Sequence, residues 1–197
     1  MSAPPTDLVT PVLLVALPQV VDPFFHKAVV LLVHHGDEGS LGIIVNRPTG
    51  IPVREILDGM EVPWGGEEGA LTYFGGPVQP QLGTVLFTPA GDGGGGSLQA
   101  ASEIAPGVSL TQHVADLGTL AGTPPPSFRL LLGYAGWGEG QLLDEILRND
   151  WLMAPVAAGL VFAAHPERAW AEALLSVGVD PDTLPSWTAA GGDEGAN

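Results

Sequence analysis

The sequence predicts a single mixed α+β domain, and three observations support that fold class. A chain of 197 residues fits one domain of upper-middle size, and it has no linker or internal repeat that would divide it. Apolar residues make up 45% of the chain, enough for a substantial core, while 28 glycines and 19 prolines favour many short elements joined by turns. Strand-like and helix-like segments are interspersed without a regular βαβ alternation, which indicates an α+β architecture.

Short apolar runs bounded by turn residues predict the strands. The clearest is residues 28–33, and Gly36–Gly39 then reverses the chain into residues 41–45, which predicts a hairpin. Further strands are expected at residues 11–16, 71–74, 83–88, 98–104, 128–132, 151–154 and 159–163, the last two as a pair.

Four sets of apolar residues recur at helical spacing, and each set predicts a helix. Proline suits the first turn of a helix, and a Ser or Thr hydroxyl can cap one. The sets are Val53, Ile56, Leu57 and Met60 behind Pro52; Leu110, Val114, Leu117 and Ala121, capped by Ser109 or Thr111; the inward-facing Leu142, Leu143, Ile146 and Leu147 within residues 139–149; and Trp170, Ala173, Leu174 and Val177, led by Pro166.

Both ends of the chain and one glycine run predict flexible segments. We expect residues 1–10 to form a flexible leader, residues 11–187 the single domain and residues 188–197 a frayed tail. The glycine-rich tip at residues 91–96 lacks the Lys, the Ser or Thr and the following helix of a phosphate-binding loop, so we expect a flexible loop there.

The apolar stretch from Val9 to Val21 does not have the features of a membrane segment. Pro11 and Pro18 break it, no basic residues precede it, and it is too short to span a bilayer. The sequence therefore predicts a cytoplasmic protein that makes no contact with the membrane.

The net charge of −16 bears on the choice of partner. Residues 1–54 hold four acids and three bases, whereas residues 55–197 hold eighteen acids and three bases. A nucleic-acid binder gains affinity through Lys and Arg, and this chain has a single lysine, Lys27. We therefore expect no direct binding of nucleic acid.

Most common catalytic and cofactor motifs are missing. The chain has no cysteine, no P-loop lysine, no H-E-x-x-H and no G-x-S-x-G, since Glu38 replaces the first glycine of the nearest match. His34 and His35 are adjacent, and neighbours on a strand point to opposite faces, so the two cannot readily share a metal ion. We expect no cofactor and no metal.

The run Gly133–Glu145 holds the first group of candidate recognition residues. A buried strand is expected to enter a turn with four glycines and then a helix, and glycine lets a backbone or ligand approach closely. The candidates in this run are Tyr134, Gly136, Trp137, Gln141 and Glu145. Tyr134 and Trp137 either form the wall of a ligand or partner site or are core aromatics, and the sequence supports both interpretations.

Arg47, preceded by Asn46, is the second candidate, and Gly75-Gly76 is the third. Arg47 follows a buried strand with few bases nearby, so it needs a partner. Either Glu145 or a helix C-terminus supplies that partner inside the fold, or Arg47 lines the same cleft as Tyr134 and clamps a carboxylate or phosphate.

The order of these motifs resembles the bacterial YqgE/AlgH family, from about Leu13 to Asp182. The resemblance implies a compact α+β domain whose branched mixed sheet includes a small barrel-like part and is surrounded by helices, in a cytosolic bacterial protein. Part of that family is labelled as transcriptional regulators through a link to alginate production, which concerns a pathway rather than DNA contact. His26 stands where the family usually has Arg. The matching blocks are Asp22-Pro23-x-Phe25, Val29-Val30-Leu31, Leu41-Gly42, Asn46-Arg47-Pro48, Tyr73-Phe74-Gly75-Gly76-Pro77-Val78, Gly83, Gly133–Leu142, Glu145-Ile146 and Trp151.

Three functions are compatible with these residues. The leading hypothesis is a non-enzymatic regulatory module that binds a small molecule or a protein and affects gene regulation indirectly. The first alternative is a hydrolase or transferase that uses Arg47, Tyr134, Glu145 and a histidine in one cleft. The second is a transcriptional regulator that contacts DNA.

Overall fold

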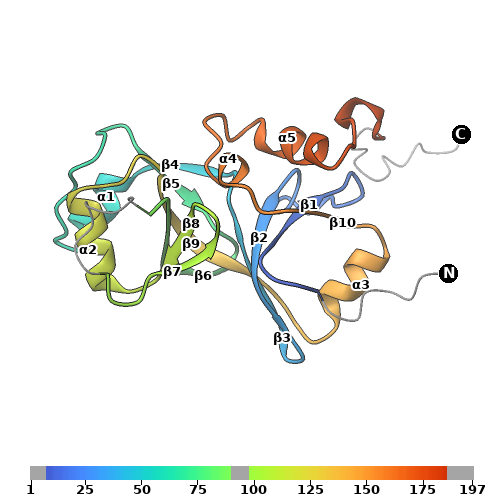
Figure 1. The fold of residues 1–197 in the computed structure, drawn as a ribbon, viewed down its shortest axis with the longest axis horizontal. Coiled ribbons are helices and arrows are strands. Elements are labelled where there is room, and N and C mark those ends of the chain that lie inside the picture. Colours follow the sequence, from blue (N-terminus) through green and yellow to red (C-terminus); the bar gives the residue numbers. More distant parts are fainter. Residues whose placement is uncertain (1–7, 90–97, 186–197) are drawn as a thin grey trace, which may run out of the picture.

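The computed structural model describes residues 8–89 and 98–185, and in that part of the chain ten strands form one sheet with five α-helices around it (Figure 1). The strands are β1 (Val12–Ala16), β2 (Val29–Gly36), β3 (Gly39–Ile44), β4 (Pro48–Pro52), β5 (Leu71–Phe74), β6 (Val78–Phe87), β7 (Ser102–Ala105), β8 (Val108–Thr111), β9 (Phe128–Trp137) and β10 (Trp151–Ala154). The helices are α1 (Val53–Asp58), α2 (Val114–Gly122), α3 (Gln141–Leu147), α4 (Ala158–Val161) and α5 (Ala169–Ser176), with a short 3-10 helix at Pro181–Thr183.

The sheet branches at β9. Along one side β9 pairs with β6; on the other it pairs first with β5, where Tyr73 lies opposite Leu131, and then with β3, where Leu41 lies opposite Gly136. The β5–β9 pair is parallel and the other strand pairs are antiparallel, so the sheet is mixed. It curls into a half-barrel, which confirms the α+β fold with a branched sheet and a barrel-like part (Figure 1).

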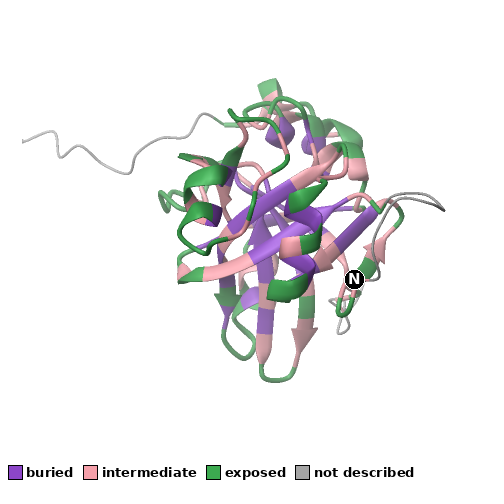
Figure 2. Cartoon of the chain, turned by 90° about the vertical axis from the view of Figure 1, so that its left-hand side faces the viewer, coloured by how far each residue is buried: buried purple, intermediate pink, exposed green. Residues whose placement is uncertain are grey.

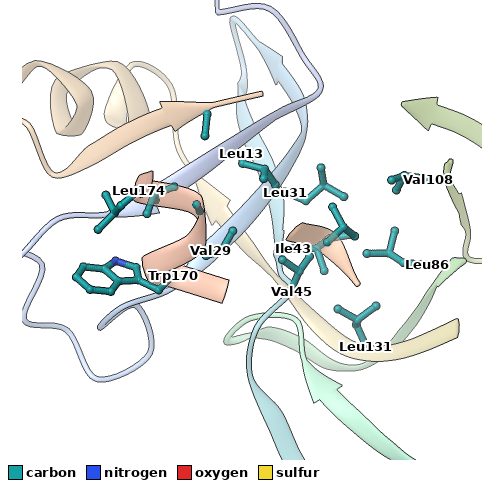
Figure 3. Packing of buried hydrophobic residues seen from close by; sticks show 14 residues of the cluster. Leu13, Val29, Leu31, Ile43, Val45, Leu86, Val108, Leu131, Trp170 and Leu174 are labelled. Atoms are coloured by element: carbon teal, nitrogen blue, oxygen red, sulfur yellow. The ribbon is translucent and has the colours of Figure 1, made fainter. Parts of the chain in front are cut away.

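Strand β1 is buried on both of its faces. Side chains alternate along a strand, and Leu13 and Val15 belong to the core cluster that includes α5, while Leu14 and Ala16 belong to the cluster that includes α3. Helices α5 and α3 accordingly lie on opposite sides of β1 and β10 (Figures 1 and 3). The continuous apolar run that predicted this strand is the pattern of a strand covered on both sides.

Helices α1 and α2 cover the other part of the sheet. Val53 and Leu57 of α1 and Leu117 and Leu120 of α2 are buried in a cluster with Val85 of β6. Each fully buried Leu or Val stabilises the fold by about 1.5–3 kcal/mol. Figure 2 shows this side of the molecule: the strands are largely buried, and the helices over them expose their outer faces.

Residues 159–163 were expected to form a strand, and this prediction is wrong: α4 occupies Ala158–Val161. The guanidinium of the buried Arg129 explains the difference, because it donates to the carbonyls of Val161 and Ala163, both at 2.6 Å. A helix end leaves such carbonyls free, whereas a strand pairs them with its neighbours. Arg129 also stacks on the Tyr73 ring at 4.3 Å, and burial lowers its pKa.

The second helix begins later than predicted. Leu110 was assigned to its apolar face but lies in β8, and the position before the helix is His113, without a side-chain cap from Ser109 or Thr111. Gly107, with φ of +73°, closes a hairpin between β7 and β8, and β8 contains the residues expected at the helix start.

Other differences are smaller. Strand β4 was not predicted, and β7 is shorter than the expected 98–104. Leu147 was expected to face inward but is 60% exposed. The leader up to residue 7, the tip at 91–96 and the tail lie outside the described residues. No helix in the described part of the chain combines the length and hydropathy needed to cross a bilayer.

Candidate recognition site

Strand β9 continues through the glycine run that was expected to be a turn. Gly133 has φ of +75° and bends the strand, and the residues that follow keep strand geometry as far as Trp137. Because side chains alternate, Ala135 and Trp137 point into the core while Tyr134 and Gly136 face outward. The candidates on this strand are therefore divided between its two faces.

Gly75 and Gly76 allow two backbone segments to cross. The Gly75 amide donates to the carbonyl of Leu132 at 2.8 Å, and a Cβ on Gly75 would lie 2.2 Å from the Gly133 carbonyl oxygen. Gly76 has φ of +153°, and a Cβ there would lie 2.1 Å from the carbonyl carbon of Tyr134. Both glycines are buried, so they serve the crossing of the chain rather than the approach of a ligand.

Glu145 connects two buried indoles. Its Oε2 accepts hydrogen bonds from the Nε1 atoms of Trp137 and Trp151, each at 2.8 Å. Its Oε1 accepts from Nε2 of Gln141 at 2.9 Å, and Oε1 of Gln141 accepts from the Gly138 amide at 3.0 Å. The network fixes Trp137 against α3. Trp151 was not among the predicted site residues. It lies beyond the end of α3, and no local sequence pattern indicates its contact with Glu145.

Arg47 and Asn46 hold the turn formed by residues 22–27. The Arg47 guanidinium donates from Nη1 to the Pro23 carbonyl at 2.8 Å and from Nη2 to the His26 carbonyl at 2.6 Å. Burial lowers the pKa of Arg47. The Asn46 side chain accepts from the Val29 amide at 2.9 Å and donates to the Lys27 carbonyl at 3.0 Å. The internal partners of Arg47 are thus backbone carbonyls of this turn, not Glu145.

The 22–27 turn packs against the two indoles through Phe25. Phe25 packs edge-to-face on Trp151, with ring centroids 5.7 Å apart, and lies 6.3 Å from the Trp137 ring. Burial, together with the charges of Lys27 and Arg47, lowers the pKa of His26.

A shallow hollow of about 440 Å³ lies on the outer face of β3 and β9, and we call it the Tyr134 hollow. Three predicted residues meet there: Tyr134, Gly136 and the edge of Trp137. Gly136 keeps the floor low, since a Cβ at this position would lie 3.4 Å from the Tyr134 ring. Within the described residues the Tyr134 hydroxyl has no hydrogen-bond partner. The remaining lining residues are His34, Glu38, Gly39, Ser40, Leu41 and Val78.

The lining residues that were not predicted come from other strands. Leu41 lies opposite Gly136 through the β3–β9 register, and Val78 lies opposite Tyr134 through β6. His34 and His35 line different hollows, as expected for adjacent residues on a strand. In residues 8–89 and 98–185, no group of three or more His, Asp and Glu side chains is placed to hold a metal ion.

The basic side chains are almost all engaged within the protein. Arg168 alone has no side-chain hydrogen bond, ion pair or ring contact among the described residues. The other five have these partners: Lys27 the Trp170 ring, Arg47 and Arg129 backbone carbonyls, Arg54 the carboxylates of Asp58 and Glu68, and Arg148 the carboxylate of Asp150.

Comparisons with known proteins agree with the fold and with the motifs. Residues 13–182 match the family model described as DUF179, AlgH-like. The chain is similar to a UPF0301 protein from Chromobacterium violaceum, with 39% identity over 175 residues that cover 88% of this chain and 92% of the relative. A UPF0301 protein from Myxococcus xanthus is 36% identical over 175 residues, covering 88% and 93%.

Two solved structures have the same fold. The solution structure of the AlgH protein from Pseudomonas aeruginosa superposes with a TM-score of 0.71 at 33% identity, over 91% of this chain and 94% of that one. A crystal structure of a Corynebacterium diphtheriae protein superposes with a TM-score of 0.70 over 87% of each chain, and at 23% identity it supports the fold alone.

Proposed function

The chain belongs to the AlgH-like family, and we propose that it is a non-enzymatic module that binds a partner protein through the Tyr134 hollow. Tyr134 and Gly136 face solvent over the edge of a fixed indole, and this is the observation that carries the proposal. We propose further that the module acts in the cytoplasm and influences gene regulation through this partner rather than by contact with DNA.

The floor of the hollow is held in place before any partner arrives. Trp137 is 6% exposed and hydrogen-bonded to Glu145, and Phe25 of the turn held by Arg47 packs behind it. Binding is favoured when a surface does not have to be ordered on association. The buried candidates therefore support recognition by positioning the floor, and Tyr134 and Gly136 are the residues that a partner would touch.

The shape and chemistry of the hollow suit a protein segment. Small molecules bind in concave sites that cover most of their surface, whereas this hollow is open and shallow. Leu41, Val78 and Gly136 provide an apolar floor, and His34 and Glu38 provide polar groups at the rim. An apolar centre with a polar rim is the usual composition of a protein interface.

The positions of the basic residues support an indirect role in regulation. Five of the six bases already have partners within the protein, and the chain carries a net charge of −16. Phosphate contacts require free cations, because affinity for DNA comes largely from replacing its counterions.

The hydrolase alternative finds little support in the contacts. Arg47 and Glu145 are each hydrogen-bonded to separate internal groups. The Ser40 hydroxyl lies 2.7 Å from Nδ1 of His35, but among the described residues no carboxylate is hydrogen-bonded to that ring to orient it as a base. The Ser40–His35 contact therefore reads as a cross-strand pair that joins β2 and β3.

Affinity capture with a matched set of variants tests the proposal. Gly136→Leu fills the hollow and His34→Ala removes a rim group, whereas Glu139→Ala changes an exposed carboxylate outside the hollow. Trp137→Ala is a poor probe because it also removes a core side chain. Circular dichroism first establishes that each variant is folded.

We expect tagged wild-type protein and Glu139→Ala to capture the same protein from a lysate of the source cells. Gly136→Leu and His34→Ala should reduce that recovery at least about tenfold, as for central interface residues. The purified pair is then measured by calorimetry. Affinity unaffected by Gly136→Leu, or capture of nothing by the wild type, would rule out the Tyr134 hollow as the binding surface.

A further inference from the structure

A second concavity, unrelated to the predicted site residues, lies between α1 and α2, and we call it the α1–α2 cleft. It has a volume of about 200 Å³ and lies over β6 and β9, in the part of the fold at the left of Figure 1. Its walls are mainly apolar and include Ile56 of α1, Leu82 of β6, Leu117 of α2 and Leu132 of β9. It shares no lining residue with the Tyr134 hollow.

No Asp, Glu, Lys or Arg lines the α1–α2 cleft, although the chain carries 22 acids. Its polar groups belong to Gln81 and to the segment from Thr111 to His113. Gln112 is held in place, since its Nε2 donates to the Thr84 hydroxyl at 2.9 Å. Its amide oxygen has no hydrogen-bond partner within the described residues, and so it is available to a ligand.

The absence of a side chain at Gly83 keeps the cleft open. Gly83 lies in β6 and lines the cleft, and a Cβ there would be 3.6 Å from Cδ1 of Leu130, an ordinary contact. A side chain at this position is therefore compatible with the strand but would occupy the space. Met60 is 44% exposed and Val114 is 63% exposed, so apolar groups of the cleft remain accessible after folding.

We propose that the α1–α2 cleft binds a small uncharged molecule that consists of one six-membered apolar ring and one hydrogen-bonding group. The size of the cleft indicates a single six-membered ring, because an apolar cavity of about 150 Å³ is enough for benzene. The scarcity of ionisable groups indicates an uncharged molecule. His113 is the one ionisable side chain of the lining and already interacts electrostatically with the Asp116 carboxylate, and a carboxylate or ammonium placed in the cleft without a partner loses its hydration at a cost of several kcal/mol. The hydrogen-bonding group of the ligand meets the Gln112 end, where the free amide oxygen accepts from a hydroxyl.

The probes are p-cresol and cyclohexanol, with benzoate and benzylammonium as charged counterparts of similar size. Saturation-transfer NMR and thermal shift measure their binding to the full chain. We expect saturable millimolar binding of both neutral probes, consistent with the small number of contacting atoms, and binding of both charged probes at least about tenfold weaker.

Two variants assign the binding to the cleft. Gly83→Val fills the space with a side chain that strands accommodate well, and it should weaken p-cresol binding at least about tenfold. Val114→Glu places a charge at an exposed position of the lining and should also weaken p-cresol binding at least about tenfold. This variant takes the place of Gly83→Val in the test if Gly83→Val does not fold. Gly118→Ala, on α2 but outside the lining, should leave binding unchanged.

Two results would overturn the proposal. One is the lack of saturable binding of either neutral probe, and the other is equal binding by the wild type and Gly83→Val. Self-association that Gly83→Val abolishes, without p-cresol binding, would assign the cleft to a second copy of the chain instead. None of these results depends on the Tyr134 hollow, which is tested by different variants.

Discussion

Replacing Glu145 by Ala should destabilise the fold, because the Glu145 carboxylate accepts hydrogen bonds from two buried indoles. Trp137 and Trp151 are 6% and 4% exposed, and both donate to the same oxygen at 2.8 Å. Neither Nε1 can turn to bulk water without moving its ring. The substitution therefore leaves two buried donors without a partner.

The expected loss follows from the cost of a buried unsatisfied donor, about 1–3 kcal/mol each. The effects are not additive, because water can enter the space that the carboxylate leaves, so we expect a loss of roughly 3 kcal/mol. That is a large part of the 5–15 kcal/mol that typically stabilises a domain, as a rough comparison. Glu145→Gln keeps one oxygen for the indoles but opposes its NH₂ to that of Gln141, so we expect a smaller loss of about 1 kcal/mol.

Urea unfolding followed by tryptophan fluorescence and circular dichroism measures these differences. The matched control is Glu139→Ala, which removes an exposed carboxylate just before α3 and should stay within about 0.5 kcal/mol of the wild type. Equal stability of Glu145→Ala and Glu139→Ala would refute the stabilising role of Glu145.

Further predictions concern the glycine crossing, pH and DNA. Gly75→Ala should cost at least about 3 kcal/mol in thermal unfolding, because its Cβ meets the Gly133 carbonyl, whereas Gly69→Ala, with open space around it, should change stability by less than about 0.5 kcal/mol. The backbone hydrogen bond from Gln99 lowers the pKa of the buried Asp116 carboxyl. The stabilisation that the Asp116 carboxylate contributes is therefore complete above the pKa of the unfolded state, about 3.9, and is lost as the pH falls through the pKa of the folded state. The difference in unfolding free energy between wild type and Asp116→Asn should shrink below that pH, and a constant difference would contradict this. The purified protein should produce no DNA gel shift even at low salt, and a salt-sensitive shift would contradict the charge argument.

The long apolar strands were predictable because each is specified locally. Residues 28–33 and 41–45 are bounded by turn residues, and the structure pairs them as β2 and β3. The short elements were not predictable in this way. Four apolar residues fit a strand or a helix equally well, and α4 is decided by Arg129, more than 25 residues away in the sequence.

The prediction of where Tyr134 and Trp137 lie depended on one assumption about glycine. Four glycines after residue 132 suggested a turn, which hid the alternation that separates Tyr134 from Trp137. Gly133 instead takes part in a crossing with Gly75 and Gly76, which are over 50 residues away, and the strand continues past it. The neighbours of Arg47 could not be predicted either, because backbone carbonyls of a turn leave no pattern in the sequence.

Strand β9 belongs to both parts of the sheet, since its first half pairs with β5 and β6 and its end pairs with β3. Separating the half that carries α1 and α2 from the half that carries α5 would require breaking one continuous ladder. The two halves should therefore melt together in a single cooperative transition, without a partly folded species in which only one of them survives.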